Sequence, residues 1–369
     1  MTDPQPAWRH PAEWELHEAT WLCWPHSRKD WPGKLAAVQW DFGETVRRIG
    51  PSERIRIIVR SPQHERVVRP VLEGEGVALE RVDFFRFPSD RSWARDAGPI
   101  FVTDAEGRVH VAHFGFTGWA RYDDWQNDAE IPRRAAEAIG LPRIEPVHAG
   151  RRVALEGGAF DVNGRGSLVT TEQCLLDPHV QVRNPGFSRR DYEEVFRRWL
   201  GVTNVIWLGR GIAGDDDTHG HVDGCCRFVD PRTLLAAVEP DGSDENHAIL
   251  SENLERLQDA RLEDGSRPTV VELPMPEPLT YRGRRLPASY TNFYICNEAV
   301  LAPTFNDPND RVALGILADL FPGRTVVGIH AVDLLLGLGS VHCLTHEQPA
   351  GRRPPAAEGD RPVRMGEPS

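Results

Sequence analysis

The chain has 369 residues, of which 27% are charged and 40% are hydrophobic, and its formal net charge is −12. These fractions exclude a disordered or fibrous protein, and the length allows a substantial core. The acidic balance argues against a nucleic-acid partner, because binding to phosphate needs clustered basic residues. The sequence shows neither an apolar run long enough for a membrane span nor a signal peptide. We therefore expect a cytoplasmic protein without a membrane partner.

The strand and helix signals repeat in one order, namely strand, strand, helix, strand. The first round covers 99–147, and further rounds begin at Ala159, at Cys226 and at about Thr291. The helix of each round is predicted at 130–139, 188–200, 244–260 and 309–321. The pattern predicts an α/β protein assembled from ββαβ units.

A fifth round requires the two ends of the chain to meet. We expect a strand at 340–345 to pair with a strand at 19–24, followed by a helix at 34–48 and a strand at 56–59. Such wrapping would leave no free sheet edge. The prediction is five radial units around a central axis, and the alternative is an ordinary mixed α/β sheet.

The five units fill one predicted domain, residues 1–350, and residues 351–369 have the composition of a disordered tail.

An acidic residue precedes the first strand at the same offset in three rounds: Asp96, Glu156 and Asp223. If the rounds are related by rotation, the three acids converge at one end of the axis, together with Cys343 from the fifth round. Such a cluster is costly as mere packing, because like charges repel and buried anions need partners. A cationic ligand would relieve that cost. The alternative is three solvated turn residues.

Six cysteines are too few to form a disulfide scaffold in a chain of this length, so we expect free thiols. Cys23 and Cys174 lie within apolar runs and are expected to be buried. Cys343 lies among small residues that let a substrate come close, and a thiolate there would be a nucleophile. On the predicted strand, His342 would point to the opposite face and is therefore a poor base for Cys343.

The densest polar cluster contains His219, His221 and Asp223, which alternate and would share one face of an extended strand. In one interpretation they bind a metal, with Cys225 or Cys226 as a further ligand. In another, His221 is a general acid/base and Asp223 orients a substrate. The third interpretation is an exposed polar turn.

A guanidinium group is planar and permanently positive, and it pairs bidentately with carboxylates. Two aspartates can clamp its nitrogens and leave the central carbon open to a thiolate. Trp93 is either a wall against such a cation or a core residue.

These motifs resemble the agmatine deiminase and bacterial peptidylarginine deiminase family, within the pentein superfamily of guanidino-modifying proteins. The matching blocks, in order, are WARDAGPIFV, LEGGAFDVNGRGSLVTTEQCLL, GHVD, SYTNFYICNEAVLAPTFNDPND and HCLT. They extend over nearly the whole chain. The resemblance implies a five-bladed α/β propeller with pseudo-fivefold ββαβ units.

The resemblance also implies the roles of site residues. Cys343 would be the nucleophile, His221 the general acid/base, and Asp96 and Asp223 the ligands of the guanidino nitrogens. The substrate contacts implied are Trp93, Glu156 and Asp217. The implied reaction is hydrolysis through a thiouronium intermediate, without cofactor or metal. Agmatine would give N-carbamoylputrescine and ammonia, and peptidyl arginine or another small guanidino compound is the alternative substrate.

The chain departs from the family pattern at Asp217, His219, Gly224, Leu338 and Ser340. Asp217 stands where a glutamate is typical, and Leu338 and Ser340 interrupt a glycine-rich approach. These departures do not affect the residues expected to act on the guanidino group. They leave undetermined which chemical group forms the tail of the substrate. A metallohydrolase built on the histidine cluster and a non-catalytic binder of cations are the competing hypotheses. The sequence does not indicate an oligomeric state.

Overall fold

The computed structural model describes residues 8–352, so the predicted tail lies outside the described residues except for its first two. The strands form five separate sheets of three or four strands and two small two-stranded ribbons. Among the helices of this described part, none is long and apolar enough to cross a bilayer.

Four units have the predicted order of strand, strand, helix, strand. The first comprises β4 (Ile100–Thr103), β5 (Val109–Ala112), α4 (Ile131–Ile139) and β6 (Arg143–Ile144). The second comprises β9 (Phe160–Val162), β10 (Ser167–Thr171), α6 (Arg189–Leu200) and β11 (Asn204–Leu208). The third comprises β12 (Cys226–Asp230), β13 (Thr233–Val238), α7 (Glu245–Asp259) and β14 (Thr269–Pro274). The fourth comprises β17 (Tyr294–Ile295), β18 (Ala299–Thr304), α8 (Asp310–Leu320) and β19 (Thr325–His330).

Each of these units starts with an antiparallel hairpin, and its last strand runs parallel to the second. The helix between them provides the crossover that a parallel pair needs. Helix α6 shows why the sequence pattern was informative. Ser188 and Asp191 form a capping box, and Gly201 ends the helix in a left-handed conformation.

The fifth unit joins the two ends of the chain, as predicted. β20 (Thr345–Pro349) pairs antiparallel with β1 (His17–Cys23), and Leu22 lies opposite Thr345. β1 in turn pairs with β2 (Arg54–Val59) across α1 (Leu35–Ile49). The sequence pattern did not reveal the additional α2 (Pro62–Gly74) and β3 (Val82–Arg86), which extend this sheet.

Two expectations about this unit are wrong. The strand starts at Thr345 rather than at residue 340, because Val341–Leu344 form the short helix α9. There the backbone N–H of His342 is bound by Asn292 and is unavailable to a strand partner. The sheets also keep their edges, because pairing stops at the outer strand of each unit.

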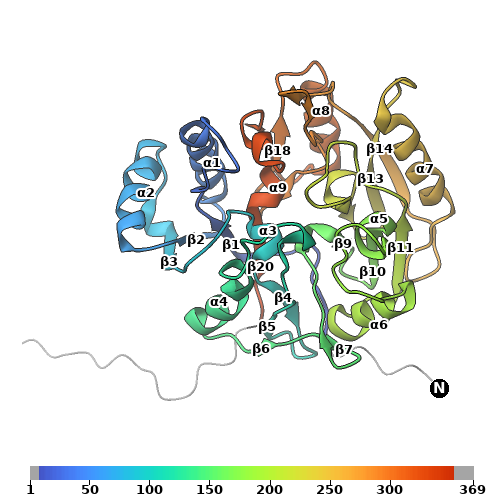
Figure 1. The fold of residues 1–369 in the computed structure, drawn as a ribbon, viewed down its shortest axis with the longest axis horizontal. Helices are drawn as coiled ribbons and strands as arrows, with labels where there is room; N and C mark the ends of the chain where they lie inside the picture. The colour runs from blue at the N-terminus through green and yellow to red at the C-terminus, as the bar shows by residue number, and fades with distance from the viewer. Residues whose placement is uncertain (1–7, 353–369) are drawn as a thin grey trace, which may run out of the picture.

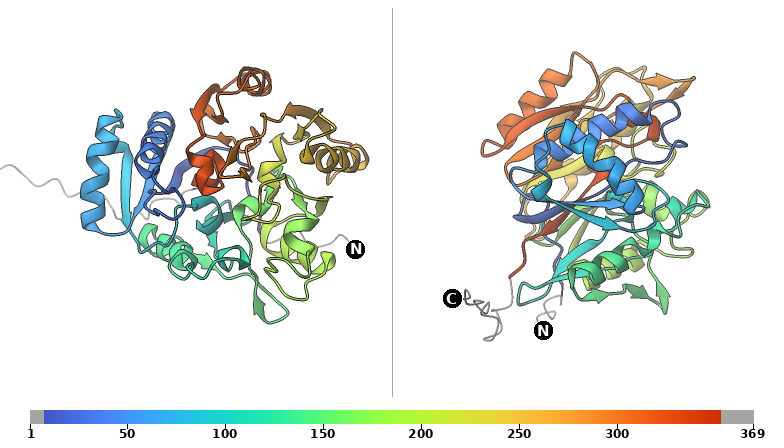
Figure 2. Two further views of the ribbon diagram at one scale, coloured as in Figure 1. Left: turned by 45° about the horizontal axis from the view of Figure 1, so that its top comes forward. Right: turned by 90° about the vertical axis from the view of Figure 1, so that its left-hand side faces the viewer.

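The long helices α1, α2, α4, α6, α7 and α8 lie around the rim, and α3 (Ala94–Ala97) and α9 lie near the middle (Figure 1). The left view of Figure 2 shows the same arrangement. Other short elements are α5 (Glu172–Leu176), β7 (Val147–His148), β8 (Arg151–Arg152), β15 (Thr280–Tyr281), β16 (Arg284–Arg285) and the 3-10 turns η1 (Leu79–Arg81), η2 (Gly118–Ala120), η3 (Asp128–Glu130) and η6 (Leu334–Gly337).

Short helical turns precede the first strand in four of the five units. They are α3, η4 (Gly157–Ala159), η5 (Val222–Gly224) and α9. α3 contacts both η4 and α9, and η4 contacts η5. The four turns therefore meet near the middle of the molecule, and they carry the polar residues described next.

Candidate active site

The acids of three units surround one point. Asp96 lies in α3, Glu156 directly before η4, and Asp223 in η5. A Cβ placed on Gly158 would lie 2.6 Å from His221 Nδ1, 2.9 Å from Asp96 Oδ1 and 3.1 Å from Asp223 Oδ2. All of these side chains are buried. The structure thus brings together groups that are far apart in the sequence.

Cys343 lies in α9, next to Asp223 of this cluster, and its side chain is partly exposed. Its Sγ is 3.3 Å from Asn292 Nδ2 and 3.9 Å from Asp223 Oδ2. Burial raises the pKa of the Cys343 thiol well above its ordinary value, and the carboxylates of Asp223 and Asp96 raise it further. The free site therefore holds a thiol rather than a thiolate.

Asp96 is fixed by two donors. Trp119 Nε1 donates to Oδ2 at 2.9 Å, and the backbone N–H of Gly158 donates to Oδ1 at 3.1 Å. Burial raises the pKa of Asp96, His221 opposes that shift, and the charge of Asp223 adds to it. The positive charge of a cation entering the site would oppose this rise in the pKa of Asp96.

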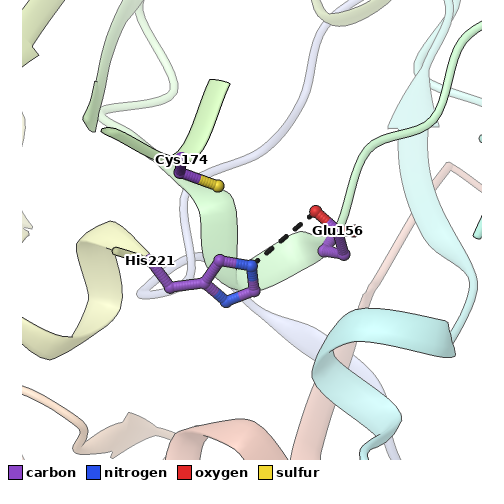
Figure 3. A group of neighbouring side chains, drawn as sticks. All are labelled: Glu156, Cys174 and His221. Atoms are coloured by element: carbon purple, nitrogen blue, oxygen red, sulfur yellow. Dashed lines mark ion pairs between the residues drawn. The ribbon is translucent and has the colours of Figure 1, made fainter. Parts of the chain in front are cut away.

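His221 lies between two carboxylates. Its Nδ1 is 3.7 Å from Asp96 Oδ1, and its Nε2 is 3.7 Å from Glu156 Oε2 (Figure 3). Burial alone would lower the pKa of His221, but Asp96, Cys174 and Glu156 outweigh it, so the pKa is raised well above 6.5. The imidazole is therefore protonated at neutral pH and can donate a proton.

Glu156 is fully buried and stays ionised. Arg183 Nε lies 3.2 Å from Glu156 Oε1. Burial raises the pKa of Glu156, but the positive charges of Arg183 and His221 lower it to about 2.

A series of buried polar contacts connects Asp223 to His342, Glu13 and Arg227, and the sequence pattern gave no indication of it. His342 Nδ1 lies 2.7 Å from Asp223 Oδ2, and His342 Nε2 lies 2.8 Å from Glu13 Oε2. Arg227 lies 3.0 Å from the same Glu13 oxygen. Burial raises the pKa of Asp223, but His342, His221 and Arg227 together lower it below its ordinary value.

The expectation that His342 and Cys343 lie on opposite faces of a strand is wrong, because both residues lie in the helix α9. His342 Nδ1 and Cys343 Sγ both approach Oδ2 of Asp223.

Asn292 is a second residue that the sequence analysis missed. Its Nδ2 donates to Asp223 Oδ2 at 3.1 Å and to the Cys343 sulfur, and Ser340 Oγ donates to its Oδ1 at 2.7 Å. It lies just before β17, near the place that an acid takes in three other units. This repeated position before the first strand of a unit could have identified Asn292 as a site residue from the sequence. Ser340, one of the departures from the family pattern, holds Asn292 in place.

Trp93 is buried beside the glycine-rich loop. Its ring lies 5.3 Å from that of Trp31. A Cβ on Gly339 would lie 2.6 Å from Trp93 and 3.0 Å from Cys343 Cβ. Small residues are therefore required between this ring and the thiol. Leu338 in the same loop adopts a left-handed conformation with φ of 70°, which costs a non-glycine residue about 1 kcal/mol.

Asp217 lies apart from the central cluster, on a pocket of about 570 Å³ that Leu338 also lines. The Tyr122 hydroxyl donates to its carboxylate, and Arg121 Nε lies 3.5 Å away. Burial raises the pKa of Asp217. Its position is compatible with a contact to the tail of a ligand rather than to the guanidino group.

His219, His221 and Asp223 do not share a face, contrary to the expectation from their alternation. His219 adopts a φ of 57°, and its Nε2 bonds to Asp177 Oδ2 at 2.9 Å. Asp223 lies in a helical turn instead of a strand. Over residues 8–352, the group of possible metal ligands is instead Glu156, Cys174 and His221 (Figure 3).

The raised pKa of Cys343 predicts how the thiol reacts. Labelling of the Cys343 peptide by neutral iodoacetamide should still be increasing with pH at pH 9, because thiolate forms only above the raised pKa. Peptide mapping by mass spectrometry measures the rate at each pH. In denaturant, the same peptide should show the ordinary thiol midpoint near pH 8.5. Equal pH profiles for the folded and denatured states would contradict the prediction.

Residues 9–349 match the sequence profile of the Porphyromonas-type peptidyl-arginine deiminase. The chain belongs to this family. The match includes every residue of the site, from Glu13 to Cys343, and it confirms the resemblance seen in the motifs. An agmatine deiminase of Pseudomonas aeruginosa (strain LESB58) is 33% identical to the chain over 368 residues, which cover 94% of this chain and 96% of the relative.

Solved structures of the family share the fold. The agmatine deiminase of Enterococcus faecalis gives a TM-score of 0.84 at 28% identity and covers 95% of this chain and 98% of its own. The putative arginine deiminase from Porphyromonas gingivalis gives 0.82 at 36% identity, with coverage of 94% and 100%. The mixed α/β fold of this family is therefore the fold of this chain.

Proposed function

We propose that the protein hydrolyses the guanidino group of a small cationic substrate, with agmatine as the first choice, and releases ammonia. The ureido product of agmatine would be N-carbamoylputrescine. One observation carries the proposal: the Cys343 thiol, the His221 imidazole and the carboxylates of Asp96 and Asp223 surround a single point. The relatives named agmatine deiminase support the same substrate.

Binding comes first in the proposed mechanism. Asp96 and Asp223 accept the N–H groups of the planar guanidinium, whose charge offsets the repulsion between the two acids. The same positive charge lowers the pKa of Cys343, so its proton leaves to solvent as the substrate enters. Substrate binding therefore creates the nucleophile.

The chemistry then takes two steps. Cys343 Sγ attacks the guanidino carbon, His221 donates a proton to the leaving nitrogen, and the C–N bond breaks to release ammonia. A thiouronium adduct remains on the sulfur. A water molecule then attacks the same carbon and gives one proton to His221. As the carbonyl group forms, the C–S bond breaks and the second proton of the water passes to the departing sulfur, which releases the ureido product and restores the Cys343 thiol.

Glu156 would hold His221 through the ion pair of Figure 3 and so keep it protonated for the first step. Trp93 would form one wall of the substrate channel, and Asp217 would contact the tail of the substrate. None of these steps uses a metal or a cofactor.

We also infer that the five sheets are the blades of a five-bladed α/β propeller. The support is the recurring ββαβ order and the contacts between α3, η4, η5 and α9 in the middle. Residues 1–350 would then form one domain.

A substrate panel tests the proposed function. Ammonia release should be measured with agmatine, free arginine, arginyl peptides and guanidino acids under identical conditions. The largest kcat/KM is expected for agmatine. A larger kcat/KM for an arginyl peptide would mean that peptidyl arginine, not agmatine, is the substrate. If no compound in the panel released ammonia although guanidino compounds bound tightly, the protein would be a non-catalytic binder of cations.

Gly158→Ala should lower kcat by about 10²-fold, because the added methyl group would displace His221 and Asp96, and small misplacements have effects of this size. Gly158 is outside the left-handed region, so alanine adds no backbone strain there. Steady-state kinetics and thermal denaturation measure the two effects. Gly224→Ala, whose Cβ would lie 3.5 Å from Ile212, should keep ordinary turnover. Equal kcat values in both variants would contradict the site geometry.

A further inference from the structure

Cys174 lies beside the catalytic histidine, and the mechanism does not use it. It belongs to α5, whereas Glu156 precedes η4 and His221 precedes η5 (Figure 3). One ligand atom from each of the three side chains lies within 4.8 Å of the others. All three side chains are buried, and Cys174 is 3% exposed.

Two polar atoms of this group form an ion pair with each other but have no hydrogen-bond partner in the described part of the chain. Glu156 Oε2 and His221 Nε2 have no hydrogen-bond partner among residues 8–352, although their residues are 0% and 2% exposed. They lie 3.7 Å apart, beyond the length of a hydrogen bond. Nearly all buried polar atoms are satisfied in folded proteins, so two unsatisfied atoms that face each other point to a missing ligand.

The donor set fits one kind of ligand. A carboxylate oxygen, an imidazole nitrogen and a thiolate sulfur are the ligands that Zn²⁺ prefers. With bonds of about 2.0–2.3 Å, two ligand atoms of a tetrahedral ion lie roughly 3.3–3.8 Å apart. For a nitrogen and an oxygen the separation is about 3.3–3.5 Å. The 3.7 Å between His221 Nε2 and Glu156 Oε2 exceeds it by only a few tenths of an ångström. Arg183 occupies only the other oxygen of Glu156 and leaves Oε2 free.

We propose that Glu156, Cys174 and His221 bind Zn²⁺ or a similar thiophilic divalent cation, and that this binding inhibits the enzyme. The inhibition rests on the proposed function, because a metal on His221 Nε2 replaces the Nε2 proton and leaves a neutral ring, which is no longer the protonated acid that the first step needs. Zn²⁺ takes the electron pairs of the three ligand atoms, and the protons of the Cys174 thiol and of Nε2 pass to water. No oxidation occurs, and water fills the fourth position.

Inhibition by zinc gives the first test. Added zinc should inhibit ammonia release, and Cys174→Ala should raise the inhibition constant about tenfold or more while turnover without zinc persists. Cys225→Ala is the matched control, because it removes another buried thiol outside the group. An unchanged inhibition constant in Cys174→Ala would overturn the proposal.

A binding measurement separates this proposal from the proposed function. Zinc binding to the Cys343→Ala variant can be measured by competition with a chromophoric chelator. This measurement does not depend on catalytic turnover. We expect one site that persists in Cys343→Ala and is lost when Cys174→Ala or Cys174→Ser is added, with thermal denaturation as the check on folding. Retention of the site in both double variants, or its loss in Cys343→Ala alone, would place the metal elsewhere and refute the assignment.

Discussion

Cys343→Ser should abolish ammonia release from agmatine, with a fall in kcat on the order of 10⁴-fold or more, because serine cannot replace a thiolate as the covalent nucleophile. Serine occupies nearly the same volume and can keep the contact with Asn292, so the fold should persist. Ammonia assays and thermal denaturation measure the two quantities. Agmatine should still bind, because the carboxylates that hold the guanidinium remain.

The control for this variant is Cys23→Ser. Cys23 is buried, and its thiol donates to the carbonyl of Arg91, a bond that a serine hydroxyl can keep. Turnover in Cys23→Ser should equal that of the unmodified protein. If Cys343→Ser kept a substantial part of the activity, the nucleophile would have to be another group.

Asp223→Asn should lower kcat/KM for agmatine by about 10²- to 10³-fold, because removing one partner from a buried ion pair costs about 3–5 kcal/mol. His342 and Asn292 both donate to one oxygen of Asp223, so an amide oxygen can keep both bonds. The loss therefore reflects the missing charge. Steady-state kinetics over a range of agmatine concentrations gives kcat and KM separately.

The same variant should make the Cys343 thiol more reactive. Among the neighbouring charges, Asp223 contributes most to the raised pKa of Cys343, so its removal lowers that pKa and increases the thiolate fraction at a given pH. Labelling by neutral iodoacetamide should thus be faster in Asp223→Asn, while turnover is slower. Simple structural damage would not produce these opposite effects. Asp177→Asn, which changes an acid outside the site, should leave both rates unaltered.

The predictable part of the fold is the part with local signals. β10 and α6 were found because a turn at 163–166 before a short strand-like run and a Ser188 cap are visible in short windows of sequence. α9 was taken for a strand because its conformation depends on Asn292, a residue distant in the sequence that binds the His342 backbone. β3 and α2 lie outside the repeated ββαβ order, so the repeat gave no reason to expect them.

The predictable part of the site was the repeated position of its acids. Asp96, Glu156 and Asp223 precede the first strands of three units. The structure places Asp96 and Asp223 beside Gly158, and Glu156 next to His221. The contact from Glu13 through His342 to Asp223 left no trace in the sequence, because it joins the start of the chain to its end. Tertiary contacts of this kind carry no local pattern.

Trapping the covalent adduct tests the central claim most directly. The protein should be mixed with agmatine, quenched in acid during turnover, digested and analysed by mass spectrometry. The account predicts that the peptide containing Cys343 gains the mass of agmatine less ammonia, and that Cys343→Ser shows no such gain. An adduct on another residue, or sustained turnover with no adduct on Cys343 at any quench time, would contradict it.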